Sequence, residues 1–144
     1  PSSALFHAEI EKRPLATPDG IMVDASGRVT LAEIKTTNKT WKSIPRTYLR
    51  QVWWQQHVLG AERTLVVWEE HQDFVPLRDE PRCAWIDRDE AEIGSLVRLA
   101  TALIDELYHR TTGNTPPRRE QAAPVSRREQ LRERDIFRAL ALAD

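Results

Sequence analysis

The chain has 144 residues, of which 40% are apolar and 30% charged, and its formal net charge is −1 at pH 7. This length suits one domain with a single core. The near-zero charge excludes attraction of nucleic acid by the molecule as a whole, so such a partner needs a local basic patch. The single cysteine, Cys83, excludes an internal disulfide and any zinc or iron–sulfur site built on several cysteines.

The first part of the chain is predicted to form three strands. Residues 4–13 alternate loosely between apolar and polar side chains, and residues 20–24 form a short apolar run. The Asp, Ser and Gly within residues 24–27 predict a tight turn. Residues 28–36 return as the third strand, so we expect a hairpin between the second and third strands.

The middle of the chain is predicted to alternate helices with strands. Residues 46–60 show the helical period and end at Gly60, a typical stop signal. Residues 63–71 are a strongly apolar strand, and residues 73–87 are predicted to form an edge strand or a hairpin. Residues 88–110 predict a long helix. Its expected apolar stripe consists of Ile93, Leu96, Val97, Ala100, Leu103, Ile104 and Leu107.

The composition changes after this helix. Residues 113–126 are rich in proline, threonine and polar side chains and are typical of a linker. Residues 127–144 predict a terminal helical tail. We therefore expect one domain over residues 1–112, with an α/β fold in which a mixed β-sheet is flanked by helices. No apolar run approaches the ~20 residues of a membrane span, so we expect a cytoplasmic protein that binds no membrane.

Charged side chains interrupt the apolar third strand. Because side chains alternate along a strand, Glu33 and Lys35 share one face, about 7 Å apart. The hairpin brings Asp19 level with Glu33, and two close carboxylates repel each other unless a cation lies between them. Their oxygens, with the Ile34 carbonyl, suit Mg²⁺ or Mn²⁺. Lys35 could then orient an attacking water and balance charge on a phosphoryl transition state.

These features also have ordinary explanations. An aspartate before glycine is often a turn residue, and a strand Glu-x-Lys is often an exposed ion pair contributing at most about 1 kcal/mol. The combined pattern favours a site, because the strand is too apolar for a purely exposed face. On helix 46–60, Gln51 shares one side with Tyr48 and Gln55. That side either points at the site or is merely solvated.

The segment after the third strand is basic and holds no acidic residue up to Arg50. We expect it to neutralise DNA phosphates without reading sequence, so that binding is salt-sensitive. Trp41 could stack on an exposed base; the alternative is an ordinary charged loop. With the polar helix side, the candidate DNA-binding residues are Lys39, Trp41, Lys42, Arg46, Tyr48, Arg50 and Gln55.

Three motifs in this order and spacing resemble the PD-(D/E)XK nuclease superfamily, and within it the YqaJ-type viral recombinase, or phage lambda exonuclease-like, family. The match is close over about residues 15–70 and looser over about residues 5–110. The motifs are Thr17-Pro18-Asp19-Gly20, Glu33-Ile34-Lys35 and Tyr48-x-x-Gln51-Val52-x-x-Gln55. The resemblance implies a restriction-endonuclease-like fold, with Asp19 and Glu33 as metal ligands and Lys35 as the catalytic lysine. It places Gln51 near the attacking water, the lysine or a substrate phosphate.

The resemblance also implies a function in DNA recombination and repair. It predicts a Mg²⁺-dependent exonuclease that digests one strand from double-stranded DNA ends, as a homo-oligomer, and passes single-stranded DNA to an annealing protein in a bacterial or phage-infected cell. The alternatives are an endonuclease of a defence or repair system with the same site, and a non-catalytic DNA-binding or assembly module of the same fold. Many family members carry a further acidic ligand on a helix before the first strand, so we expect either a missing upstream helix or a simpler site.

Overall fold

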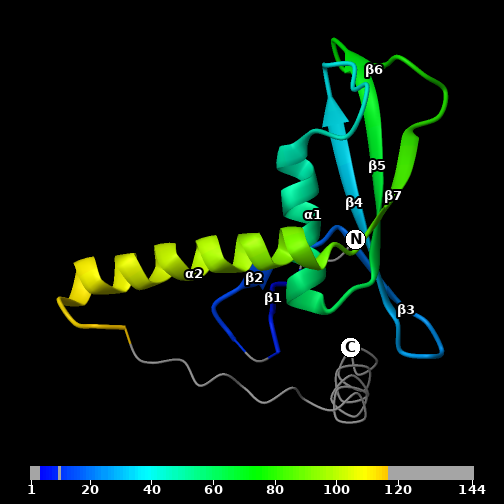
Figure 1. Ribbon diagram of the computed structural model, residues 1–144. Helices are drawn as coiled ribbons and strands as arrows, with labels where there is room; N and C mark the ends of the chain where they lie inside the picture. The colour runs from blue at the N-terminus through cyan, green and yellow to red at the C-terminus, as the bar shows by residue number, and fades with distance from the viewer. Residues whose placement is uncertain (1–3, 10, 117–144) are drawn as a thin grey trace.

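The computed structural model describes residues 4–9 and 11–116. A five-stranded mixed sheet forms its centre, and helix α1 packs between this sheet and helix α2 (Figure 1). The sheet order is β3-β4-β5-β6, and β7 also pairs with β5. The strands are β3 (Gly20–Val23), β4 (Val29–Thr37), β5 (Arg63–Gln72), β6 (Val75–Pro76) and β7 (Arg82–Asp87).

The expected single strand over residues 4–13 is wrong. The structure has two short strands, β1 (Phe6–His7) and β2 (Leu15–Ala16), which pair antiparallel as a separate sheet. The chain reverses between them because its charged residues bond within the turn: the Arg13 guanidinium donates to the Glu11 carboxylate at 2.6 Å. The Ala8 amide donates to the Pro14 carbonyl at 3.1 Å and closes the reversal.

The predicted hairpin between β3 and β4 is confirmed. The Asp24 carboxylate accepts the backbone N–H groups of Ser26 at 2.8 Å and Arg28 at 3.1 Å. Gly27 follows with φ of 80°, a conformation that glycine adopts without steric cost. The turn residues therefore set the register, which pairs Gly20 with Ala32.

Helix α1 (Arg46–Leu59) connects the parallel strands β4 and β5 and ends, as predicted, at Gly60, where φ is 63°. Parallel neighbours need such a crossover, because a tight turn cannot join them. Val52 of α1 is fully buried with Trp41, Val66 and Trp68, and these four residues form the main core cluster. This packing fixes α1 on the face of the sheet that carries the charged residues of β4.

Helix α2 (Glu90–Thr112) is capped at its N-terminus by Asp89, whose side chain accepts the backbone N–H groups of Ala91 and Glu92. Only Ile93 of its expected apolar stripe is buried; Leu103 and Leu107 are each 62% exposed. Among the described residues, the stripe beyond Ile93 is not buried because α2 extends past the sheet and α1 (Figure 1).

Gly113, with φ of 71°, ends α2 at the start of the predicted linker. The rest of that linker from residue 117, and the predicted tail over 127–144, lie outside the described residues. Neither α1 nor α2 combines the length and the apolar character that crossing a membrane requires.

Candidate active site

Glu33 is the centre of a polar cluster between β4 and α1. The residue is only 2% exposed. One oxygen, Oε1, accepts hydrogen bonds from the Lys35 ammonium and from Gln51 Nε2, the latter at 2.7 Å. The other, Oε2, accepts from Gln55 Nε2 at 2.7 Å. A buried carboxylate is costly unless it is paired and hydrogen-bonded, and these three donors meet that condition.

Lys35 lies beside Glu33, as the strand alternation predicts. Its ammonium forms an ion pair with Glu33, and its side chain is 19% exposed. The Lys35 Nζ atom lies 5.2 Å from the centroid of the Tyr48 ring, whose face attracts a cation. Since an ammonium has three N–H donors, one bond to Glu33 leaves capacity for a phosphate oxygen.

Asp19 immediately precedes β3 and lies level with Glu33 of β4. The register pairs Gly20 with Ala32, so the preceding residue falls opposite Glu33. Asp19 Oδ2 accepts the backbone N–H of Ile34 at 2.7 Å. The carboxylate thus bonds to the backbone of β4 next to Glu33, where the pairing with β3 stops.

One side of α1 supplies the remaining groups. Tyr48, Gln51 and Gln55 are spaced three, four and seven residues apart and so lie on one helix face. Tyr48 contacts the Lys35 ammonium, and both amides donate to Glu33. The interpretation as a merely solvated face is excluded for Gln55, which is buried, while Gln51 is exposed and still bonds to Glu33. Their side chains hold the carboxylate in one orientation.

The donor set fits a divalent cation of the Mg²⁺ type. Among the described residues, Asp19 Oδ1 accepts no hydrogen bond, and Glu33 Oε2 accepts only one. Each oxygen therefore keeps lone-pair capacity, and the Ile34 carbonyl is a third hard oxygen nearby. No group of three or more His, Cys, Asp or Glu side chains within residues 4–9 and 11–116 could hold a metal. Mg²⁺ is commonly held by only one or two carboxylates together with substrate phosphates, so Asp19 and Glu33 fit such an ion.

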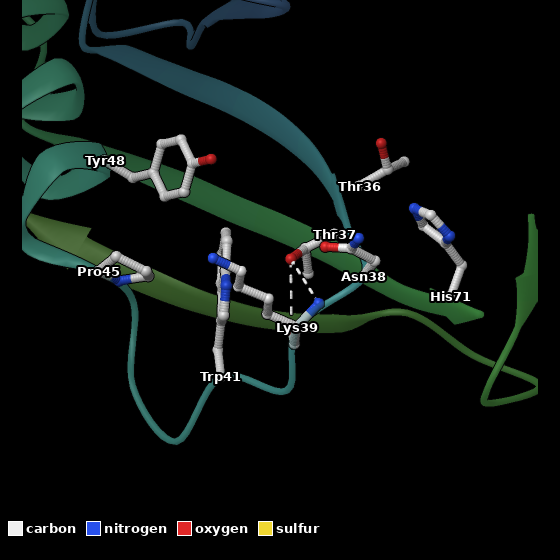
Figure 2. Close-up of a pocket in the computed structure, with 8 residues that line it drawn as sticks. All are labelled: Thr36, Thr37, Asn38, Lys39, Trp41, Pro45, Tyr48 and His71. Atoms are coloured by element: carbon white, nitrogen blue, oxygen red, sulfur yellow. Dashed lines mark hydrogen bonds between the residues drawn. The ribbon is translucent and has the colours of Figure 1, made fainter. Parts of the chain in front are cut away.

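A surface hollow of about 450 Å³ lies at the carboxyl end of β4, and Figure 2 shows the residues that line it. Tyr48 lines it and also contacts Lys35, so the hollow adjoins the charged site. The lining residues are Thr36, Thr37, Asn38, Lys39, Trp41, Pro45, Tyr48 and His71. Several of these follow the carboxyl ends of the parallel strands β4 and β5, where α/β sheets commonly bind ligands. Asn38 and His71 also line the hollow, although neither was among the candidate site residues predicted from the sequence.

Two candidate DNA-binding residues are corrected by the structure. Trp41 is 7% exposed and stacks on Trp68, with ring centroids 5.9 Å apart. Its backbone N–H donates to the Glu70 carboxylate at 3.1 Å. The prediction that Trp41 stacks on a base is wrong, because the ring completes the core under the loop. Gln55 is 3% exposed and bonds Glu33, so it does not face DNA.

The other candidates differ in their surroundings. Lys39, Lys42 and Arg50 are exposed and remain predicted phosphate contacts. Arg46 is also exposed, but its guanidinium forms an ion pair with Glu92 of α2 at 2.5 Å. This pair offsets the charge of Arg46 and links α1 to α2.

No protein-family model and no curated protein matches the chain. Among solved structures it is similar to the crystal structure of SSO0001, at 19% identity and a TM-score of 0.51, over 70% of this chain and 47% of that one. The fold is shared. The crystal structures of an alkaline exonuclease, LHK-Exo from Laribacter hongkongensis, and of LHK-Exo in complex with dAMP match at 23% and 24% identity. Each has a TM-score of 0.49 and is matched over 78% of this chain and 62% of its own.

The chain thus spans about half to three-fifths of the length of the structures it matches. The predicted fold class is confirmed: the protein is an α/β structure with a mixed sheet and packed helices.

Proposed function

We propose that the chain carries the active site of a metal-dependent DNA nuclease. One observation carries the proposal: a buried carboxylate, Glu33, is joined to the ammonium of Lys35 and oriented by two amides of α1. If Glu33 and Lys35 formed only an exposed ion pair, Glu33 would not be buried and bonded by side chains of α1. If they formed only a structural ion pair, no hollow would be expected beside them. The motif that these residues form resembles PD-(D/E)XK nucleases, which supports phosphodiester hydrolysis as the reaction.

The proposed roles follow from the contacts. Asp19, Glu33 and the Ile34 carbonyl would hold Mg²⁺, or Mn²⁺ in its place. The bound ion would supply Lewis-acid stabilisation of charge on the phosphate. Gln51 and Gln55 keep Glu33 in its orientation. Lys35 donates to the phosphate or to the attacking water and offsets the negative charge that develops in the transition state.

The finer proposal is a recombination-type exonuclease that acts on double-stranded DNA ends in the cytoplasm of a bacterial or phage-infected cell. The family motif supports this, including the glutamines of α1. Lys39, Lys42 and Arg50 would bind the phosphate backbone. We extend the proposal to a homo-oligomer that delivers single-stranded DNA to an annealing protein, as the family resemblance implies.

Degradation of linear duplex labelled at the 5′ or 3′ end, with Mg²⁺ or with EDTA, tests this function. We expect Mg²⁺-dependent loss of one strand while closed circular DNA stays intact. Lys35→Ala should abolish cleavage, while Lys12→Ala, at an exposed lysine before β2, should not. Cleavage of the closed circular DNA would show that the protein is an endonuclease and not an exonuclease. Binding without cleavage would favour a non-catalytic module and overturn the enzymatic proposal.

A further inference from the structure

The turn between β5 and β6 displays an aromatic ring at an unusual backbone conformation. Asp73 and Phe74 have φ of 50° and 64°, and within residues 4–9 and 11–116 they alone combine positive φ with a side chain larger than glycine's. Hairpin turns of this kind favour glycine at the second position, and a bulky residue there is strained. Phe74 is also 93% exposed. Both the backbone strain and the exposure oppose stability, so neither explains why the ring is there.

A second aromatic side chain supports Phe74. The imidazole of His71 lies parallel to it, with ring centroids 5.8 Å apart and an interplanar angle of 7°. A hollow of about 410 Å³ is lined by Asn38, His71, Gln72, Asp73 and Phe74. Asn38 and His71 also line the hollow beside the active site, where Figure 2 shows them opposite Tyr48. The two hollows therefore adjoin at Asn38 and His71, and together they extend from Tyr48 to Phe74.

The length of this surface suits a nucleic-acid strand. Lys35 pairs in register with Trp68, and Phe74 follows six positions later in the chain. At about 3.3 Å per residue this separates them by at most roughly 20 Å. Successive nucleotides of a B-form strand are about 3.4 Å apart along the axis, so a strand at Lys35 reaches Phe74 within about six nucleotides.

We propose that Phe74, supported by His71, is a stacking platform for an unpaired base of the DNA strand that passes Lys35. This inference rests on the proposed nuclease function and names a contact with its substrate. An aromatic face accepts any base, so the contact carries no sequence code. The carboxylate of Asp73 beside the ring disfavours phosphates, so the ring meets a base while Lys39 meets the backbone. Phe74 thereby takes the role that the sequence suggested for the buried Trp41.

Binding measured in EDTA separates this contact from catalysis. The full chain is titrated with blunt duplex and with duplex carrying a six-nucleotide overhang, with normal bases or abasic sites. We expect Phe74→Ala to lower affinity for the normal overhang about 5- to 100-fold. The loss should be absent on the abasic overhang, and Phe74→Trp should restore binding. Leu77→Ala is the matched control, because this neighbouring side chain is 54% exposed but lines neither hollow.

Phe74→Gly controls for misfolding, because glycine adopts the positive φ without strain. This variant should therefore unfold at a temperature no lower than that of the parent protein. It should lose affinity as Phe74→Ala does. The stacking role of Phe74 is overturned if both variants bind the overhang as the parent does, or if Leu77→Ala loses as much affinity for the overhang. It is also overturned if the parent protein binds neither the blunt nor the overhang duplex. If the stacking proposal fails but the parent protein cleaves DNA and Lys35→Ala does not, the proposed nuclease function still holds.

Discussion

Two buried glutamates on the same face of the sheet behave differently. Glu33 of β4 is 2% exposed and Glu70 of β5 is 4% exposed. The register pairs Glu33 with Val66, four residues before Glu70, so the two carboxylates share a face about 13 Å apart along the strands. Glu33 receives one ammonium and two side-chain amides. Glu70 receives the Trp41 backbone N–H at 3.1 Å and the Arg82 guanidinium at 3.3 Å.

The difference shows that burial of a carboxylate does not by itself mark a catalytic site. The bonds to Glu70 attach the loop after β4 to the sheet, and Arg82 also donates to the Trp41 carbonyl at 2.8 Å. These contacts lower the pKa of Glu70, chiefly through the Trp41 N–H. Glu33 instead accepts hydrogen bonds from long side chains of α1 and from Lys35, and it lies close to a surface hollow. One carboxylate stabilises a loop, and we propose that the other does chemistry.

The largest effect is expected when Glu33 and Glu70 are each replaced by glutamine. Glu33→Gln should lower cleavage at least about 100-fold, because the metal loses a charged ligand and Lys35 its partner. Glu70→Gln should cleave near the parent rate but unfold at a lower temperature, because Arg82 loses its charged partner. Labelled-duplex rates and thermal unfolding by circular dichroism measure both effects. A folded Glu70→Gln protein that has lost cleavage as severely would contradict the distinction.

Removing an amide should have a smaller effect. Gln51→Ala should reduce activity, or raise the Mg²⁺ concentration for half-maximal activity, about 10- to 100-fold, because Glu33 loses a donor that orients it. Thr47→Ala, at an exposed position of α1 that lines neither hollow, is the control. A Mg²⁺ titration of cleavage by the two variants checks this. Equal titration curves would mean that Gln51 does not position the ligand.

The lowered pKa of Glu70 predicts a pH dependence of stability. Because the folded pKa lies below the ordinary value of 4.5, the charged form stabilises the protein above about pH 4.5. That contribution is lost as pH falls through the lowered pKa. The difference in unfolding free energy between the parent and Glu70→Gln should therefore shrink from pH 7 towards pH 3. A constant difference across this range would show that the Glu70 charge does not stabilise the loop.

The smallest effect is expected at the loop that Glu70 holds in place. Lys39→Ala should weaken DNA binding about equally for all sequences. It should also reduce the slope of log affinity against log salt by about 0.7–1, as expected for one phosphate contact. Anisotropy at several salt concentrations measures the slope, with Lys12→Ala as control. An unchanged slope would remove Lys39 from the backbone contacts.

Local chemistry explains what could be predicted. The Asp24 turn, the end of α1 at Gly60 and the shared face of Glu33 and Lys35 all depend on residues close in sequence. The glutamine spacing on α1 depends on the helical period alone. For these features, turn preferences and side-chain periodicity act before the rest of the chain packs, so the amino-acid sequence by itself determined them.

Long-range packing decided the rest. Trp41 is buried because Glu70, 29 residues later, bonds its backbone and Trp68 stacks on its ring. The distal leucines of α2 stay exposed because the helix outruns the sheet, and Phe74 is displayed because its turn leaves the strands. Burial depends on which surfaces meet, and residues far apart in the chain meet only in the folded protein. The pattern of charged and apolar residues therefore predicted the candidate site, while only the tertiary structure decided which side chains surround it.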